Sequence, residues 1–416
     1  MVLRRLAAKW WRHYQEKLAR KWIRSQIPSR ADLDAMEDCI RRIRATTYWS
    51  WPRGSRLHFY KFPAEWREDA RDGVKFWHLS TPPKSYMRNI KSESREAELA
   101  TRLKIFKLRY QWYLERGFTD CLVPRFSIVK VMIDGVVADI RVVWDCTANG
   151  HNDTLWVPSF MLPTFQDAAD MVVKWLPIPV GDYLEQGSPV LDYTQEAATF
   201  IPTFQGDIDV GSMFHNFLAH MTERHSLGVR YTETDPTAVL EHDIFLRFCR
   251  LNFGNKASPY LACQMQSRIN EMSMKHPDDP KSAFQWERVY LNLPCDKGYD
   301  PSFPRAILLR TDNEMATRQA TYVDDIRVAG RGRTATKLAC RQLKSEMSSV
   351  GNQPSDKKYR QPSATSGAWK GEIIHTDTPF PMKSTTGKKW AKFKDGLQLV
   401  LAKSRDSGFI ETSTLR

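Results

Sequence analysis

The segment 321–329, TYVDDIRVA, constrains the fold of this chain more than any other, because it places two acidic residues between residues that favour β-strands. Two β-forming runs with a short polar break predict a tight hairpin with Asp324 and Asp325 at its tip. Adjacent carboxylates repel each other, which costs free energy unless cations neutralise them. The segment therefore indicates either a solvated surface turn or a metal site.

A second acidic cluster lies more than a hundred residues earlier in the sequence. Asp207 and Asp209 precede Val210, and Phe214 follows five residues after Asp209. An Asp at the end of a strand can hold a cation and place an aromatic ring beside it at the start of a helix, which we expect near Val210. An Asp that caps this helix is the alternative interpretation.

Composition and charge exclude several classes of protein. The seven Cys are scattered and form no C-x-x-C pair, which predicts reduced thiols in a cytoplasmic or nuclear protein that is not secreted. No apolar run approaches 18 residues, so no membrane-spanning helix is expected. The formal charge of +14 divides into +9 over residues 1–60, −6 over 61–326 and +11 over 327–416. Basic ends suit a protein that holds a polyanion with its flanks, and two solvated basic faces are the alternative.

The hydrophobic pattern alternates between helical and strand periods without βαβ regularity, which favours an α+β fold. Val- and Ile-rich residues around Asp134-Gly135 predict a hairpin over 124–145, and polar residues predict a loop over 351–367. Helical spacing predicts further helices over 1–27, 92–116, 165–175, 334–348 and 389–403, and after Ser258-Pro259.

Taken in order, the two acidic motifs resemble the palm of a reverse transcriptase, where D-x-x-x-x-F/Y is followed by Y-x-D-D. Between them, residues 253–259 (FGNKASP) resemble the third palm motif of that family, F-G-x-x-x-S/A-P. The resemblance is to retrotransposon enzymes of the Ty3/gypsy type, and it covers roughly residues 120–375.

The resemblance implies a right-hand polymerase of the α+β class. It implies fingers with a β-hairpin over 106–205, a palm with an antiparallel sheet over 206–376, and a truncated, partly helical thumb or connection over 377–416. Residues 1–105 would form a basic, largely helical N-terminal extension. Residues 276–301, HPDDPKSAFQWERVYLNLPCDKGYDP, would be an insertion with its own strand.

The implied activity is template-directed DNA synthesis from a primer, that of an RNA-directed DNA polymerase and nucleotidyltransferase. Its partners would be an RNA or DNA template with a primer, and dNTPs. Its cofactors would be two Mg²⁺ ions, which Mn²⁺ can replace. Protease, RNase H and integrase domains would be encoded elsewhere. A decayed or domesticated element that only binds nucleic acid is the alternative function, and a viral RNA polymerase is a third.

Carried over residue by residue, the resemblance assigns the catalytic and metal-binding roles to Asp209, Asp324 and Asp325, with the backbone carbonyl of Val210 as a further metal ligand. Phe214 would crowd the sugar C2′ and favour deoxynucleotides, which disfavours an RNA polymerase. The nucleotide-binding residues would be Lys130, Arg141, Phe214, Gly254, Ser258, Pro259, Tyr322 and Lys358. The primer grip would contain Trp369 and Gly371.

The basic segment 330–334, GRGRT, follows the acidic hairpin directly. It is too short and wrongly spaced for a P-loop. It is expected to contact nucleic-acid phosphates, or to have no binding role.

Overall fold

The computed structural model describes residues 59–407, with gaps at 91, 93, 111–112, 134–135, 173–202, 234–241, 300, 302–304, 313, 357, 366, 370 and 377–381. The chain forms two compact units. Unit 1 comprises Met1–Met161, Val210–Ser273 and Ser345–Pro354, and unit 2 comprises Leu162–Asp209, Met274–Lys344 and Ser355–Arg416. The basic helix expected over 1–27 lies outside the described residues.

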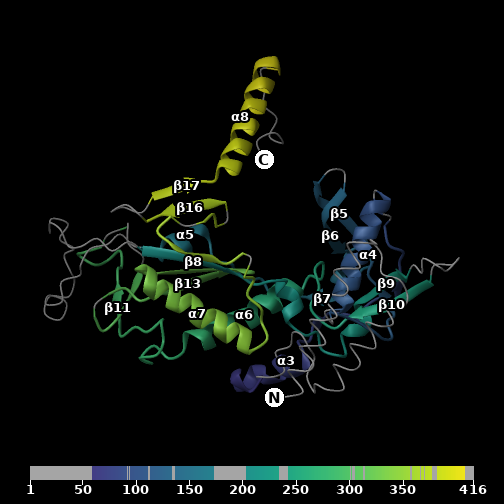
Figure 1. Ribbon diagram of the computed structural model, residues 1–416, viewed down its shortest axis with the longest axis horizontal. Coiled ribbons are helices and arrows are strands. Elements are labelled where there is room, and N and C mark those ends of the chain that lie inside the picture. Colours follow the sequence, from purple (N-terminus) through teal and green to yellow (C-terminus); the bar gives the residue numbers. More distant parts are fainter. Residues whose placement is uncertain are drawn as a thin grey trace. The chain divides into compact units, whose positions relative to one another are not determined.

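Unit 1 contains a five-stranded sheet with the order β2-β4-β9-β10-β3, of which Figure 1 labels β9 and β10. Its strands are β2 (Ser85–Tyr86), β3 (Leu114–Arg116), β4 (Cys121–Leu122), β9 (Gly228–Glu233) and β10 (His242–Phe248). A two-stranded sheet joins β1 (Trp77–His78) to β7 (Leu155–Trp156). Short helical elements complete the unit: η2 (Ala64–Trp66), α3 (Arg67–Asp72), η3 (Asn152–Thr154), η4 (Met213–Asn216) and η5 (Arg224–Ser226).

The hairpin predicted over 124–145 is confirmed as β5 (Arg125–Ile133) and β6 (Val136–Trp144), which pair antiparallel. Its expected turn residues lie outside the described residues. Helix α4 (Arg95–Tyr110) contacts β6, and the Lys104 ammonium donates to the Ile140 carbonyl at 2.6 Å. The helix expected over 92–116 ends at Tyr110, because the next residues form β3 and pair with β10.

The helix predicted after Ser258-Pro259 is confirmed as α6 (Ser258–Met274). The prediction of a helix near Val210 is wrong, since only the four residues of η4 are helical there. Ser212 has a left-handed backbone (φ 52°), and beyond η4 Leu218 bridges Arg250 in extended conformation. These backbone pairings leave no room for a longer helix.

Unit 2 is organised by a four-stranded antiparallel sheet with the order β13-β14-β8-β15. Its strands are β8 (Thr203–Asp209), β13 (Arg318–Tyr322), β14 (Asp325–Arg331) and β15 (Arg360–Ser363). The predicted hairpin at 321–329 is therefore confirmed. β15 lies where a loop was predicted. Its Pro362 suits an edge strand, because an edge strand does not need every backbone N–H for pairing.

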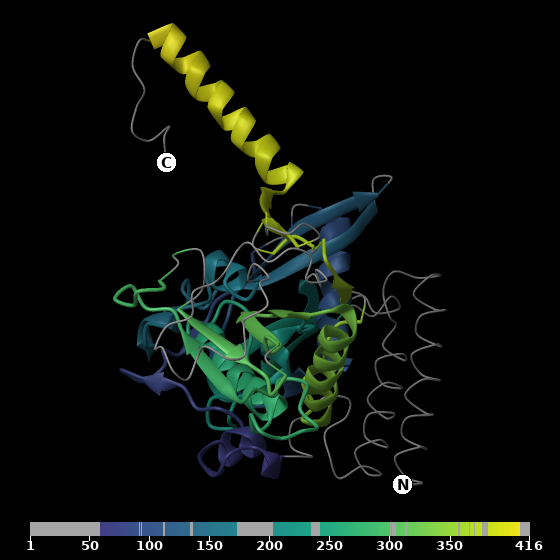
Figure 2. The same ribbon diagram turned by 90° about the vertical axis from the view of Figure 1, so that its left-hand side faces the viewer.

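Helix α7 (Arg333–Ser349), predicted over 334–348, lies against one face of this sheet (Figures 1 and 2). The Thr336 hydroxyl donates to the Gly330 carbonyl at 3.0 Å. A Cβ on Gly206 would lie 2.9 Å from the Cys340 sulfur, so the glycine permits the close approach of strand and helix. Alternation along the strands leaves the acidic residues of β8 and β14 on the other face.

The remaining elements of unit 2 are two hairpins and two helices. The segment expected to be an insertion contains β11 (Arg288–Leu291), paired with β12 (Ala306–Leu309). Figure 2 shows the second hairpin, β16 (Glu372–His375) with β17 (Met382–Thr385), leading directly into α8 (Gly387–Ser407). Helix α5 (Phe165–Ala169) is shorter than the predicted 165–175, and α8 extends beyond the predicted 389–403 at both ends.

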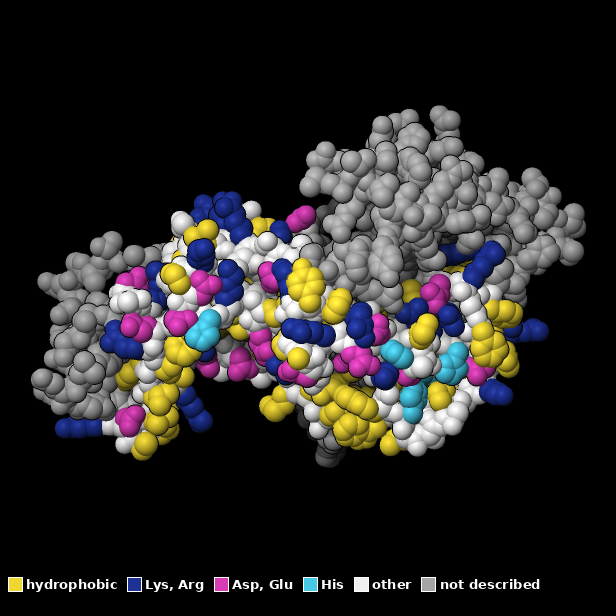
Figure 3. All heavy atoms as spheres, turned by 90° about the horizontal axis from the view of Figure 1, so that it is seen from below, with side chains coloured by type: hydrophobic (Ala, Val, Ile, Leu, Met, Phe, Trp, Pro, Cys, Tyr) yellow, Lys and Arg dark blue, Asp and Glu magenta, His cyan; other side chains and the backbone are white. Residues whose placement is uncertain are grey.

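On the face seen in Figure 3, acidic, basic and hydrophobic side chains of the described residues are interspersed. Among the described residues, no helix is both long and apolar enough to span a membrane. The described chain is thus a mixed α and β structure, while its division into fingers (106–205), palm (206–376) and thumb (377–416) stays a prediction.

Candidate active site

Strand pairing brings the three predicted catalytic carboxylates together. Asp209 is the last residue of β8 and Asp325 the first residue of β14, and their Cα atoms are direct partners in the antiparallel register. The turn between β13 and β14 consists of Val323 and Asp324 alone, because Tyr322 pairs with Asp325. Side chains more than a hundred residues apart in the sequence therefore meet at one end of the sheet.

A cavity of about 500 Å³ opens at this end of the sheet. The side chain of Asp209 is only 8% exposed, and its Oδ1 has no hydrogen-bond partner. Asp325 is exposed, and Asp324 is half-buried. The cavity wall includes Asp207, Asp209, Asp324, Asp325, Lys358 and Trp369.

The electrostatics of the cavity favour a cation. Asp325 is exposed as a residue, but the cavity wall partly desolvates its carboxylate, and this desolvation, followed by repulsion from Asp324 and Asp209, raises the pKa of Asp325 to about 6. Burial also raises the pKa of Asp324. The Lys358 ammonium donates to Asp209 Oδ2 at 2.7 Å, and this hydrogen bond raises the pKa of Lys358. The lysine thus supplies positive charge to a cluster that otherwise repels itself.

The donor set suits a hard divalent ion, because carboxylate oxygens are the ligands that Mg²⁺ prefers. The unpartnered Oδ1 of Asp209 is such an oxygen. In the part of the chain that the structure describes, however, no three acidic, His or Cys groups converge closely enough to hold one ion. Binding by all three carboxylates therefore requires a change of side-chain rotamers, with Lys358 moving away from Asp209.

A buried ion pair lies next to the carboxylates, and it was missed by the sequence reasoning. The Arg327 guanidinium is fully buried and donates to both carboxylate oxygens of Asp207, at 2.8 and 3.0 Å. It also donates to the Gly367 carbonyl at 2.7 Å and to the Gln205 side chain at 3.3 Å. Asp207 and Arg327 each lie two residues from a predicted catalytic carboxylate, so strand alternation could have placed them on the same face.

The two residues of the predicted primer grip form a tight turn in unit 2. Backbone hydrogen bonds join Trp369 and Glu372 in both directions, at 2.8 and 3.1 Å. Gly371 has a left-handed backbone (φ 83°), which favours glycine. Trp369 lies on the cavity wall, and the Arg327 guanidinium carbon is 5.6 Å from the centroid of its ring. The Tyr322 ring packs edge-on against it, with 6.2 Å between the two ring centroids.

The residues predicted to grip the triphosphate lie on the β5–β6 hairpin of unit 1. Lys130 on β5 and Arg141 on β6 are both exposed. Arg141 pairs with Ile128, and the register shifts between Val129 and Val131, which places Lys130 at an irregularity of the strand. Their proposed contact with a triphosphate stays a prediction.

The third palm motif and the predicted sugar gate also belong to unit 1. Gly254 has φ 98°, and a Cβ there would lie 1.7 Å from the Trp144 carbonyl oxygen, so its close backbone approach is to β6. The Phe214 ring packs against the Phe253 ring, with 4.7 Å between the two ring centroids. Ser258 and Pro259 start α6, and Val210 is buried and bridges Pro354.

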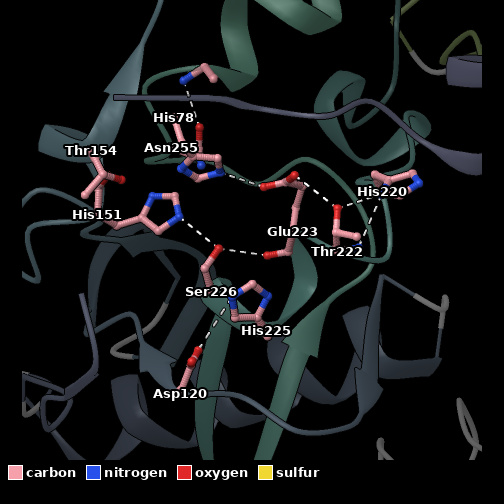
Figure 4. A network of polar contacts seen from close by, with 11 residues as sticks. His78, Asp120, His151, Thr154, His220, Thr222, Glu223, His225, Ser226 and Asn255 are labelled. Atoms are coloured by element: carbon pink, nitrogen blue, oxygen red, sulfur yellow. Dashed lines mark hydrogen bonds and ion pairs between the residues drawn. The ribbon is translucent and has the colours of Figure 1, made fainter. Parts of the chain in front are cut away.

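Unit 1 contains a second polar cluster, shown in Figure 4. His78 Nε2 lies 2.7 Å from a carboxylate oxygen of Glu223, and His151 Nε2 lies 3.0 Å from the Ser226 hydroxyl. His151 and Ser226 are fully buried, and burial lowers the pKa of His151 to about 4. A neutral, inaccessible imidazole of this kind has a structural role, and its contact with Ser226 links the start of η3 to η5.

Comparisons with known proteins give a distant structural similarity. No family model matches the chain, and no curated protein matches it. Among solved structures, a foamy viral protease-reverse transcriptase in complex with double-stranded DNA is similar, with 12% sequence identity and a TM-score of 0.45. The match covers 82% of this chain and 48% of that chain, so this chain spans about half the length of the solved structure.

Proposed function

We propose that this chain is a template-directed DNA polymerase that extends a primer on an RNA or DNA template with dNTPs. The observation that carries the proposal is the meeting of Asp209, Asp324 and Asp325 on the wall of one cavity. The order and form of the three palm-like motifs support the same reading. The proposed cofactors are two Mg²⁺ ions, which Mn²⁺ can replace.

In the proposed mechanism, Asp209, Asp324 and Asp325 would hold the metal ions as deprotonated carboxylates, together with the Val210 carbonyl. When bound, the ions supply activation of the primer 3′-hydroxyl and stabilisation of the leaving pyrophosphate. The Lys358 ammonium lies 2.7 Å from Asp209 on the same cavity wall, and it would contact the phosphates of the nucleotide. The Arg327–Asp207 pair fixes the strands from which the carboxylates project.

The substrate-binding residues of the proposal come from the resemblance. Lys130 and Arg141 would bind the triphosphate, and Phe214, five residues beyond Asp209, would exclude the ribose 2′-hydroxyl. Gly254, Ser258, Pro259 and Tyr322 would complete the nucleotide site, and the turn at Trp369 and Gly371 would hold the primer.

One observation favours the alternative, a decayed element that binds nucleic acid without catalysis. Lys358 occupies Asp209 Oδ2, and no three potential ligands of the described residues converge on one point. A chain that had lost metal binding could keep this arrangement permanently.

Primer extension separates the two functions. The chain is given oligo(dT) on poly(rA) with dTTP and either Mg²⁺ or Mn²⁺, in parallel with Asp324→Asn and Asp325→Asn. Asp356→Asn is the matched control, because that carboxylate is 87% exposed and outside the cavity wall. We expect extension by the parent and the control only, since an amide cannot supply the charge that the metal ions need.

Three results would contradict the proposal. Equal extension by all variants would show that these carboxylates are not catalytic. Template binding without extension by any variant would favour the non-catalytic alternative. Efficient extension with ribonucleotides in a parallel reaction would indicate an RNA polymerase.

A further inference from the structure

Unit 2 contains a second cavity, of about 600 Å³, whose wall carries four cationic side chains. These are Lys281, Arg310, Arg331 and Arg333. None of the described residues that line the cavity is acidic. A strongly positive concave surface of this size indicates a ligand that carries negative charge.

The cavity is assembled from segments distant in the sequence. Arg331 ends β14, Arg333 begins α7, and Gly332 between them has a left-handed backbone (φ 76°) that makes the sharp change of direction. These residues are the centre of the GRGRT segment. Arg310 follows β12, and Lys281 lies in the loop after α6.

The loop that carries Lys281 is held in place by buried polar contacts. The Ser282 hydroxyl donates to the Met274 carbonyl at 2.6 Å and accepts from the Gln342 amide at 3.3 Å. The Gln342 side chain in turn accepts from the Ala283 backbone N–H at 2.9 Å. These contacts fix the loop to α7, so the wall of the cavity is preformed.

Two of the four cations are already paired, and two are not. Arg310 pairs with Asp312 at 3.2 Å, and Arg331 pairs with Glu314. Lys281 and Arg333 are exposed and make no ion pair within the described part of the chain. Burial lowers the pKa of Arg331, while the adjacent Glu314 carboxylate acts in the opposite direction.

We propose that this cavity binds phosphate groups, with Lys281 and Arg333 as the residues available to contact the ligand. Arginine presents a planar fork of donors that matches phosphate oxygens, and lysine adds a mobile point charge. The α7 dipole adds positive potential, because the helix begins here. The ligand is a phosphodiester backbone or a free polyphosphate compound, which share this chemistry.

The site is separate from the carboxylate cavity and does not depend on the proposed polymerase function. The two cavities have no wall residue in common. Asp325 and Arg331 stand at opposite ends of β14, about 20 Å apart at the usual rise per residue of a strand. Phosphate binding here would need no divalent ion.

The test compares two double variants of the full chain in EDTA, which removes metal-dependent binding at the carboxylates. Lys281→Gln/Arg333→Gln removes two charges from the cavity. The control variant Lys337→Gln/Arg341→Gln also removes two exposed charges. Both lie on α7, the helix that carries Arg333, but outside the cavity wall. One arm measures the fluorescence anisotropy of a labelled oligo(dT) as NaCl is raised, and the other measures the heat of binding of inorganic pyrophosphate. Circular dichroism checks that each variant is folded.

We expect weaker binding by the cavity variant than by the matched control. In the oligonucleotide arm, the negative slope of log K against log [NaCl] should become shallower by about 1.4, since each lost phosphate contact on a single strand removes about 0.7 from its magnitude. Lys281→Arg/Arg333→Lys should keep the parent's slope. A loss in the oligonucleotide arm identifies a nucleic-acid backbone as the ligand, and a loss with pyrophosphate alone identifies a free phosphate compound. Equal binding by both double variants in both arms, or no binding by the parent in either, overturns the proposal.

Discussion

Val323 has a backbone that its side chain disfavours. Its φ of 54° is left-handed, and branched side chains rarely adopt that conformation. The surrounding strands impose it, because Tyr322 and Asp325 pair across a turn of only two residues. Local strain of this kind persists where the structure around it is over-determined, which is common at functional sites. The strand pairing thus holds Asp324 in the turn beside Asp325 despite the strain at Val323.

The first prediction at the residue scale concerns pH and metal. Burial and the charges of Asp324 and Asp209 raise the pKa of Asp325 from 3.8 to about 6. The Asp325 carboxylate therefore binds a proton more tightly in the folded state than in the unfolded chain. As a result, its contribution to the free energy of unfolding without metal is lost as pH rises from about 4 to about 6. Since metal binding needs the deprotonated form, Mg²⁺ should raise the melting temperature more at about pH 7.5 than at about pH 5.

Thermal denaturation with Mg²⁺ or EDTA, at matched ionic strength, measures this difference. Asp325→Asn should reduce the Mg²⁺ shift at the higher pH, whereas Asp356→Asn should preserve it. A Mg²⁺ shift that is the same at both pH values would show that Asp325 does not bind the ion.

The residues of the candidate site differ in how far the sequence could place them. Asp209, Asp324 and Asp325 stand in motifs with a characteristic local form, so they could be named before the structure was known. The hydrogen bond between Lys358 and Asp209 joins positions 149 residues apart, and nothing in the local pattern specifies it. The environment of a residue is set by its partners in space, and these were not predictable from single motifs.

At the scale of elements, the pairing of β8 with β14 is reinforced by the Arg327–Asp207 ion pair. Breaking a buried pair by removing one partner leaves the other charge without compensation. Arg327→Met should therefore lower the free energy of unfolding by about 3 kcal/mol. The double variant Arg327→Met/Asp207→Leu should recover part of this loss, because no buried charge is left unpaired.

Urea denaturation of the parent and three variants completes the double-mutant cycle. The control is Lys389→Met, which breaks the exposed ion pair between Lys389 and Glu372. Because these side chains are 52% and 31% exposed, the variant should lose less than about 1 kcal/mol of unfolding free energy. If the double variant is no more stable than Arg327→Met, the cost does not arise from the Asp207 carboxylate, which without Arg327 keeps only its longer contact with Arg360, at 3.9 Å.

Elements with local signals were predictable, and those that depend on distant partners were not. The β5–β6 and β13–β14 hairpins follow from adjacent strand-forming runs. Helices α7 and α8 follow from helical spacing, and α6 also follows from its Ser-Pro start. β15 has a polar sequence, and only its pairing with β8, some 150 residues earlier, makes it a strand. Ser212, directly before the four-residue η4, has a left-handed backbone that its residue type gives no reason to expect, and no longer helix forms near Val210.

At the scale of the whole molecule, a formal charge of +14 predicts strong salt dependence of nucleic-acid binding. Lys388, Lys392 and Lys394 on α8 are exposed and contribute to the basic C-terminal region. Affinity for a single-stranded oligonucleotide should fall by at least about tenfold between about 50 and about 200 mM NaCl. Substitution of the three lysines by Gln should make the dependence shallower.

Fluorescence anisotropy over a NaCl series measures both effects. Lys75→Gln, which changes one exposed lysine of unit 1, should alter the slope less than the triple variant does. Binding that is independent of NaCl would show that phosphate contacts contribute little to the affinity.

The chain passes between the two units five times, at residues 161–162, 209–210, 273–274, 344–345 and 354–355. Neither unit can therefore be produced as one continuous stretch of residues. During synthesis on the ribosome, β8 emerges more than a hundred residues before β14 and still longer before β15. The nascent chain must keep an unpaired central strand from aggregating over that interval, so we expect slow folding and a need for chaperones.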